Sequence, residues 1–305
     1  MADANFKRYI DKFFKHLQLY DDIHNGHKYK DLLKAVIDAF LENENSYNAY
    51  EVYETFFMIY QITSENKSHP DETAQPFISN EPNSLLELVK IMKRYENSTG
   101  DLIRQQRDHF IHSVNVFLLG LAIYSQNATY RQTFNSYVKN SNYKKYYRFK
   151  NKNGKGFSVS NEEFLYRWGI AALFHDIGYP VEIIANQLKQ FITEGVQSIS
   201  LSYTVETGID FKNFYEFNSI RRIKPEFADR YREMFPESKF LDLFVPTNIM
   251  AHKISRELDV DLEELIRNLN GFVDYMGEKG FIDHGFFSSI LVLNSLAKSF
   301  TSSLK

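Results

Sequence analysis

The chain has 305 residues, of which 43% are hydrophobic, and its formal net charge is −3. This length and apolar content suffice for a sizeable core, and the near balance of charge excludes a whole-molecule attraction to nucleic acid or anionic lipid. The absence of cysteine excludes disulfides, thiolate nucleophiles and cysteine-ligated zinc, so any metal site has to use histidine and carboxylate.

Hydrophobic spacing predicts an all-α helical bundle. Glycine and proline are scarce, at 13 and 7 residues, while 27 phenylalanines and 20 tyrosines supply bulky groups for a core. Apolar residues recur at intervals of three and four, the period of an amphipathic helix. We expect helices over 6–17, 32–41, 46–62, 84–95, 107–125, 161–176, from 180 onward, and over 225–234, 246–258, 261–276 and 283–300. Ser160 or Asn161 is expected to cap the helix over 161–176.

Two segments interrupt the helical pattern. Residues 64–83 are polar, contain three prolines and lack periodicity, which predicts a surface linker. We therefore expect an N-terminal helical extension plus linker over 1–83, and a helical domain over 84–305 whose C-terminal completeness is left open. Alternation around an Asn-Gly pair in 146–160 predicts one small inserted β-hairpin.

No segment has the character of a signal peptide or a membrane span. Residues 1–17 are charged throughout, and the longest apolar run, 116–124, is too short to cross a bilayer. We expect a cytoplasmic protein with no membrane partner. Whether it forms an oligomer is left open.

Three predicted helices each carry a histidine at the edge of an apolar face. His112 lies three residues after His109, the doublet His175-Asp176 ends a second helix, and His284 opens a third. Neutral imidazoles with a carboxylate bind a divalent metal and leave positions open for water. Taken alone, each histidine is more often a hydrogen-bonded core residue, and Asp176 alone is more often a helix cap.

The doublet is expected at a helix end. Adjacent side chains cannot face the same way on a regular helix, so His175 and Asp176 can act together only where the backbone leaves the helix. Gly178 is expected to let the chain turn there.

Three segments in this order resemble the HD-domain superfamily of metal-dependent phosphohydrolases: RDHFIHSVNVFLLGLA, ALFHDIGYP and DHGFFSSILVL. The resemblance covers about residues 107–296. It implies an HD-type bundle with His112, His175 and Asp176 as metal ligands and Asp176 as the catalytic residue that holds metal and hydroxide together. His284 matches the histidine that binds a second metal in dinuclear members. The implied cofactor is a divalent Mn, Fe, Mg, Zn, Ni or Co ion.

The chain departs from the family pattern at two places. Many relatives carry a lysine shortly after the doublet, where this chain has Tyr179-Pro180. The family's closing aspartate comes from a downstream helix, whereas no aspartate, glutamate or histidine follows His284. Three explanations stay open: the chain is one piece of a longer product, the last ligand is an upstream residue such as Asp274 or comes from a partner chain, or the site is incomplete and no longer catalytic.

Candidate substrate-binding residues lie near the first motif. Arg107 and His109 precede His112, and each could contact a phosphate. In an equally good alternative, Arg107 is exposed to solvent and His109 supports the metal ligands without touching the metal. Residues 144–155 hold six cations and no acid among aromatic neighbours, a composition suited to a nucleotide or single-stranded nucleic acid. We favour the other interpretation of this segment, a solvated hairpin protected by its charges.

The resemblance implies hydrolysis of a phosphoester or phosphoanhydride in a nucleotide-like substrate by a metal-activated water, with Lys144 and Arg148 as further substrate contacts. One alternative is a catalytically incomplete HD module that serves as a regulatory, scaffolding or ligand-binding protein. A metal-dependent nuclease acting on single strands is another.

Overall fold

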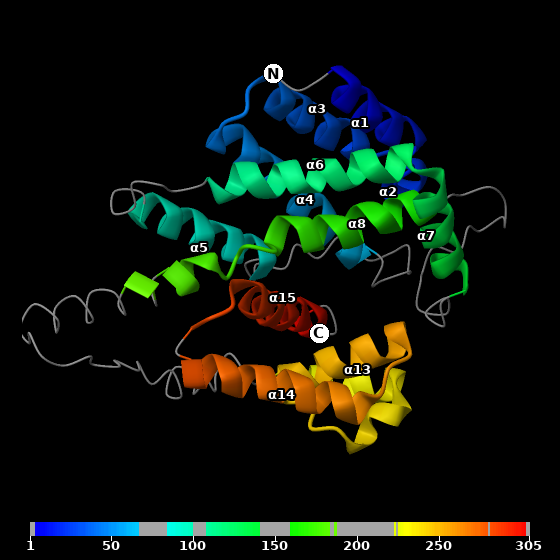
Figure 1. The fold of residues 1–305 in the computed structure, drawn as a ribbon. Coiled ribbons are helices and arrows are strands. Elements are labelled where there is room, and N and C mark those ends of the chain that lie inside the picture. The colour runs from blue at the N-terminus through cyan, green and yellow to red at the C-terminus, as the bar shows by residue number, and fades with distance from the viewer. Residues whose placement is uncertain are drawn as a thin grey trace, which may run out of the picture. The chain divides into compact units, whose positions relative to one another are not determined.

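The computed structural model describes residues 4–66, 84–99, 108–140, 159–183, 186–187, 223, 225–279 and 281–302 (Figure 1). Its elements are helices, and these residues contain no strand, which confirms the predicted all-α class. Residues 146–158 of the predicted β-hairpin lie outside the described residues. The last two residues of that segment, 159 and 160, belong to a helix. None of the described helices is long and apolar enough to cross a membrane.

The helices follow one another along the chain, with short connections wherever the whole connecting segment is described. They are α1 Ala4–His16, α2 Tyr20–Asn25, α3 Tyr29–Glu42, α4 Ser46–Asn66, α5 Ser84–Thr99, α6 His109–Gln126, α7 Ala128–Asn140, α8 Val159–Phe174, α12 Pro225–Met234, the 3-10 helix η2 Pro236–Phe240, α13 Pro246–Leu258, α14 Leu262–Lys279 and α15 His284–Ser302. Helices α2, α7 and η2 were not predicted.

Contacts between Cα atoms divide the chain into two compact units. One comprises residues 1–86 and 97–174, and the other comprises residues 87–96 and 175–305. This division does not test the domain boundary expected after residue 83.

Helix α6 is the centre of the first unit, where it packs against α1, α4, α7 and α8 (Figure 1). Two glycines permit this packing. A Cβ atom at Gly120 would lie 2.0 Å from Nε1 of Trp168, and one at Gly169 would lie 2.2 Å from the ring of Phe56. The Trp168 indole fills the space at Gly120 and donates a hydrogen bond from Nε1 to the carbonyl of Phe117 at 2.9 Å. The glycines therefore set how closely α6 and α8 approach their neighbours.

Aromatic rings fill the core between α1, α6 and α8. The rings of Tyr124 and Phe164 stack with centroids 4.0 Å apart, and Phe13 meets Tyr124 edge-on at 5.9 Å. Asn161 is buried beside them, accepting a hydrogen bond from the Tyr124 hydroxyl at 3.0 Å and donating one to the carbonyl of His16 at 2.9 Å. The prediction that Ser160 or Asn161 caps α8 was wrong, because the helix begins at Val159. The amide of Asn161 instead satisfies polar groups on other elements.

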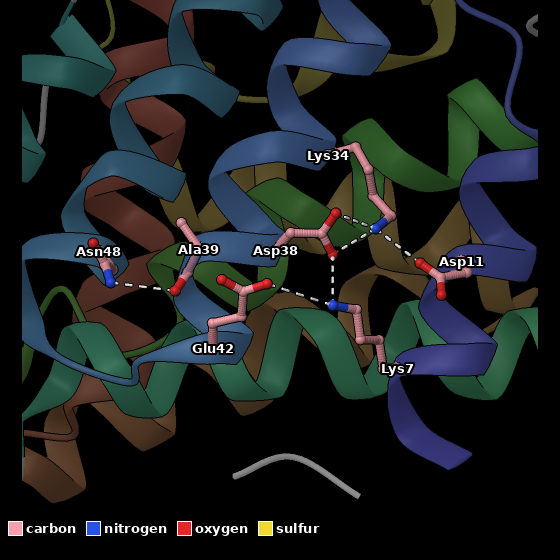
Figure 2. Close-up of polar contacts among 7 residues, drawn as sticks. All are labelled: Lys7, Asp11, Lys34, Asp38, Ala39, Glu42 and Asn48. Carbon is pink, nitrogen blue, oxygen red and sulfur yellow. Dashed lines mark hydrogen bonds and ion pairs between the residues drawn. The ribbon is translucent and has the colours of Figure 1, made fainter. Parts of the chain in front are cut away.

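A network of charges joins α1 to α3 on the surface of the first unit (Figure 2). The Lys34 ammonium lies 2.8 Å from Asp11 and 2.5 Å from Asp38, and Lys7 lies 3.8 Å from Asp38 and 3.9 Å from Glu42. Partial burial acts to lower the pKa of Lys34, but its hydrogen bonds to Asp11 and Asp38 outweigh that effect and the pKa is raised. These residues are partly exposed, so each pair contributes little stability on its own.

The second unit is built around α13 and α15. Helix α13 packs against α14 and α15, and α12 packs against α15 and η2. His252 of α13 is only 2% exposed, and its Nδ1 lies 2.8 Å from the hydroxyl of Tyr231 on α12. Its Nε2 has no hydrogen bond and lies 3.8 Å from Glu237. Burial lowers the pKa of His252, and the nearby cations Arg256 and Lys253 act in the same direction, against Glu237.

Candidate metal centre

The His-Asp doublet directly follows the last residue of α8. Helix α8 ends at Phe174, and residues 175–178 form a turn. The buried Tyr53 hydroxyl of α4 donates a hydrogen bond to the carbonyl of Leu173 at 2.7 Å. This bond satisfies one of the carbonyls that a helix C-terminus leaves without an intrahelical partner. A residue 120 positions away in sequence thus stabilises the helix end from which the doublet starts.

Gly178 is required for a close approach and not for a left-handed turn. Among the described residues, Gly26 is the glycine with positive φ, so the expectation that Gly178 supplies unusual backbone freedom was wrong. A Cβ atom at Gly178 would lie 2.4 Å from the carbonyl oxygen of His284 and 3.0 Å from the amide nitrogen of Ser288. The Gly178 amide donates to the Ser288 hydroxyl at 2.8 Å. The turn after the doublet therefore packs directly on the first turn of α15.

An aspartate fixes where α15 begins. The Asp283 carboxylate accepts a hydrogen bond from the amide of Phe286 at 2.7 Å, the geometry of an N-cap. His284 is consequently the first residue of α15, and its side chain is 38% exposed.

Helix α6 also begins with a histidine that follows an N-cap aspartate. The Asp108 carboxylate accepts from the amide of Ile111 at 3.0 Å and from the hydroxyl of Ser46. His109 is the first residue of α6 and is buried, whereas His112 lies one turn later and is partly exposed.

One group of possible metal ligands converges among the described residues, and it contains His112, His175 and Asp176. One ligand atom from each lies within 4.8 Å of the others. Nε2 of His175 is 3.2 Å from Oδ1 of Asp176, and Asp176 is 7% exposed. Two ligands that each bind one cation at about 2.1 Å lie roughly 3 to 3.5 Å apart at angles of 90 to 110°. The donor types of all three residues, and the separation between His175 and Asp176, fit a divalent metal ion.

His284, the fourth predicted metal residue, does not belong to the converging group, but it faces the same carboxylate. Its Nε2 lies 3.5 Å from Oδ1 of Asp176, and its Nδ1 lies 2.5 Å from Oε2 of Glu182. The Tyr179 ring meets the imidazole edge-on at 5.7 Å. Sequence reasoning missed Glu182, and the available signal was its position one helical turn after Tyr179, which places both side chains on the same face.

The remaining predicted residues divide into two groups. Arg107, Lys144 and Arg148 lie outside the described residues, so their roles stay predictions. Asp274, suggested as an upstream replacement for the closing aspartate, is exposed on α14 and does not belong to the converging group.

The comparisons with known proteins give no assignment. No protein-family model matches the chain, and neither the curated proteins nor the solved structures include a significant match. His112, His175 and Asp176 form a cluster that could hold a metal ion.

Proposed function

We propose that this chain is a metal-dependent phosphohydrolase of the HD type, acting on a phosphoester or phosphoanhydride of a nucleotide-like substrate. The observation that carries the proposal is the convergence of His112, His175 and Asp176, which come from two separate motifs 63 or more positions apart in sequence. Such convergence of two imidazoles and a carboxylate is what a hydrolytic metal site requires.

Each residue has a distinct task under this proposal. His112 and His175 hold the metal through neutral nitrogens, which leave its charge available to the substrate. Asp176, buried beside them, is the catalytic carboxylate that holds the metal and accepts a hydrogen bond from the attacking water. A bound divalent ion supplies a water of lowered pKa and a Lewis acid for the phosphoryl oxygen.

Substrate recognition is assigned to cations and to a buried imidazole. Arg107 is the residue suited to a phosphate, because its guanidinium forms paired hydrogen bonds with phosphate oxygens. His109 begins α6 next to the capping residue Asp108, where it can support either substrate or the metal ligands. Lys144 and Arg148 add positive charge for a nucleotide phosphate or, in a nuclease, for a single strand.

The competing proposal is an HD module without catalysis. The observation in its favour is that residues 285–305 contain no aspartate, glutamate or histidine that could serve as the family's closing ligand. Such a module would serve regulation, scaffolding or ligand binding, and its His-Asp doublet would retain a structural role only.

Product release from a panel of phosphate compounds distinguishes these functions. The panel contains nucleoside mono-, di- and triphosphates, cyclic nucleotides and single-stranded oligonucleotides, each assayed with Mn²⁺, Co²⁺, Mg²⁺, Ni²⁺, Zn²⁺ or Fe²⁺. We expect metal-dependent release of phosphate or a nucleoside product by the wild type and its loss in His175→Ala/Asp176→Ala. The matched control is His27→Ala, at an exposed position of the first unit, which should retain the activity. Turnover that survives in the double variant, or no turnover with any metal, would contradict the proposal.

A further inference from the structure

We propose that Glu182 is a positioning residue of this centre, which holds the His284 imidazole by Nδ1 so that Nε2 faces the metal held at Asp176. The inference rests on the proposed metal-dependent function, takes His284 as the ligand that the family resemblance implies, and adds Glu182 as the group that orients it.

The hydrogen bond between Glu182 and His284 determines which imidazole nitrogen is free. An ionised carboxylate has no proton to donate, so at the 2.5 Å separation Nδ1 of His284 is the donor and Oε2 of Glu182 the acceptor. Nε2 is the imidazole nitrogen that faces Asp176. Metal-binding histidines commonly donate their second nitrogen to a carboxylate in this way, which fixes the tautomer and strengthens the ligand.

Nε2 of His284 faces the carboxylate of Asp176. Nε2 of His284 and Oδ1 of Asp176 are 3.5 Å apart. This is about the separation of two ligands that bind one metal ion. Oδ1 of Asp176 is also 3.2 Å from Nε2 of His175, so one carboxylate oxygen lies near both imidazole nitrogens.

The segment after the doublet holds His284 by several contacts. Gly178 packs against the carbonyl oxygen of His284, and the ring of Tyr179 meets the imidazole edge-on. The amides of Val181 and Glu182 lie 3.1 and 3.5 Å from the carbonyl oxygen of Gly178, which starts the helical residues 179–183. The Glu182 side chain is 28% exposed, so its contact with His284 is partly shielded from water.

The alternative role for Glu182 is direct ligation of the metal. The two roles differ in their dependence on His284: a positioning carboxylate acts through the imidazole, whereas a ligand acts without it. A double-mutant cycle measures this dependence.

Cobalt affinity of the full chain is the test. Metal-free protein is titrated with Co²⁺ and the visible absorption of the bound ion is recorded for the wild type, Glu182→Gln, Glu182→Ala, His284→Ala and Glu182→Ala/His284→Ala. We expect Glu182→Ala to weaken binding by about 10- to 100-fold. Glu182→Gln should weaken it less, because the amide oxygen still accepts the Nδ1 proton. In the His284→Ala background, Glu182→Ala should change affinity by less than about twofold, since the group it acts through is gone.

The control variant is Glu278→Ala, which removes an exposed acid of α14 and should bind Co²⁺ as the wild type does. Thermal unfolding of each metal-free variant checks folding, and the near-isosteric Glu182→Gln carries the test if Glu182→Ala does not fold. Equal weakening by Glu182→Ala in both backgrounds, or wild-type affinity in His284→Ala, would overturn this inference and leave the proposed function intact. A wild type that binds no metal would overturn both.

Discussion

One tyrosine hydroxyl donates a hydrogen bond to the last turn of α8, immediately before the His-Asp doublet. Tyr53 of α4 is fully buried and donates to the carbonyl of Leu173. A buried carbonyl that loses its partner costs more than the net value of the bond, because it cannot turn to water. The bond therefore contributes both to stability and to the position of the doublet.

Tyr53→Phe should lower the free energy of unfolding by about 1–2 kcal/mol, because the Leu173 carbonyl is left buried without that donor. The control is Tyr47→Phe on the same helix, whose side chain is 68% exposed and whose change should stay within about 0.5 kcal/mol. Denaturant unfolding measures both. Equal stabilities of the two variants would show that the Tyr53 hydroxyl does not support this helix end.

The buried His252 makes stability depend on pH. Its pKa is lowered from the ordinary value of 6.5, first by burial, so the unfolded chain takes up a proton at a higher pH than the folded chain does. Stability from this group is complete above about pH 6.5 and decreases as the pH falls below it. The melting temperature of His252→Gln should therefore fall less between pH 7.0 and 5.5 than that of the wild type. An identical loss in both proteins would contradict the lowered pKa.

At the residue scale, the sequence predicted ligand types better than their supporting contacts. The doublet and His112 could be found because the helical period and the motif place them at the edges of apolar faces. Glu182 was missed because its place one turn after Tyr179 is a weak signal by itself. Its partner lies 102 positions away, and the packing of Gly178 on α15 brings the two together.

Single helices were most accurately predicted where local signals mark their ends. Helices α12 and α13 begin at prolines and were predicted residue for residue, since proline suits the first turn. Helix α7 was missed because its composition is polar. Its signal was the helical spacing of Tyr130, Phe134 and Tyr137: Phe134 meets Phe164 edge-on at 5.3 Å. Such a stripe is recognised only when aromatic residues are counted as core residues among polar neighbours.

Gly178→Ala tests the contact between the turn after the doublet and α15. The new methyl group would lie 2.4 Å from the carbonyl oxygen of His284, so α15 must shift. We expect a loss of about 1–3 kcal/mol in unfolding free energy, together with weaker metal binding. The control is Gly271→Ala in α14, where a Cβ atom meets nothing within 4 Å and stability should rise by about 0.5–1 kcal/mol. Similar effects of the two variants would contradict the proposed close packing.

At the scale of the whole molecule, the chain forms two compact units of helices, and the sequence predicted the all-α class from the spacing of its apolar residues. The cluster of His112, His175 and Asp176, which could hold a metal ion, is formed by the folded chain.

A metal ion that binds only the folded state stabilises it by mass action. With Mn²⁺ or Co²⁺ at 100 times the dissociation constant, the unfolding free energy should rise by about 2.7 kcal/mol. Scanning calorimetry should show the increase in melting temperature, its reversal by a chelator, and its absence in His175→Ala/Asp176→Ala. An increase of the same size in that double variant would place the stabilising metal elsewhere.

The most direct test of a metal centre at the doublet is the metal content of protein purified without chelator. Plasma mass spectrometry should find close to one equivalent or more of a divalent transition metal in the wild type, and little in His175→Ala/Asp176→Ala. No metal in either protein, even after reloading with Mn²⁺ or Fe²⁺, would contradict the account and leave the doublet with a structural role only.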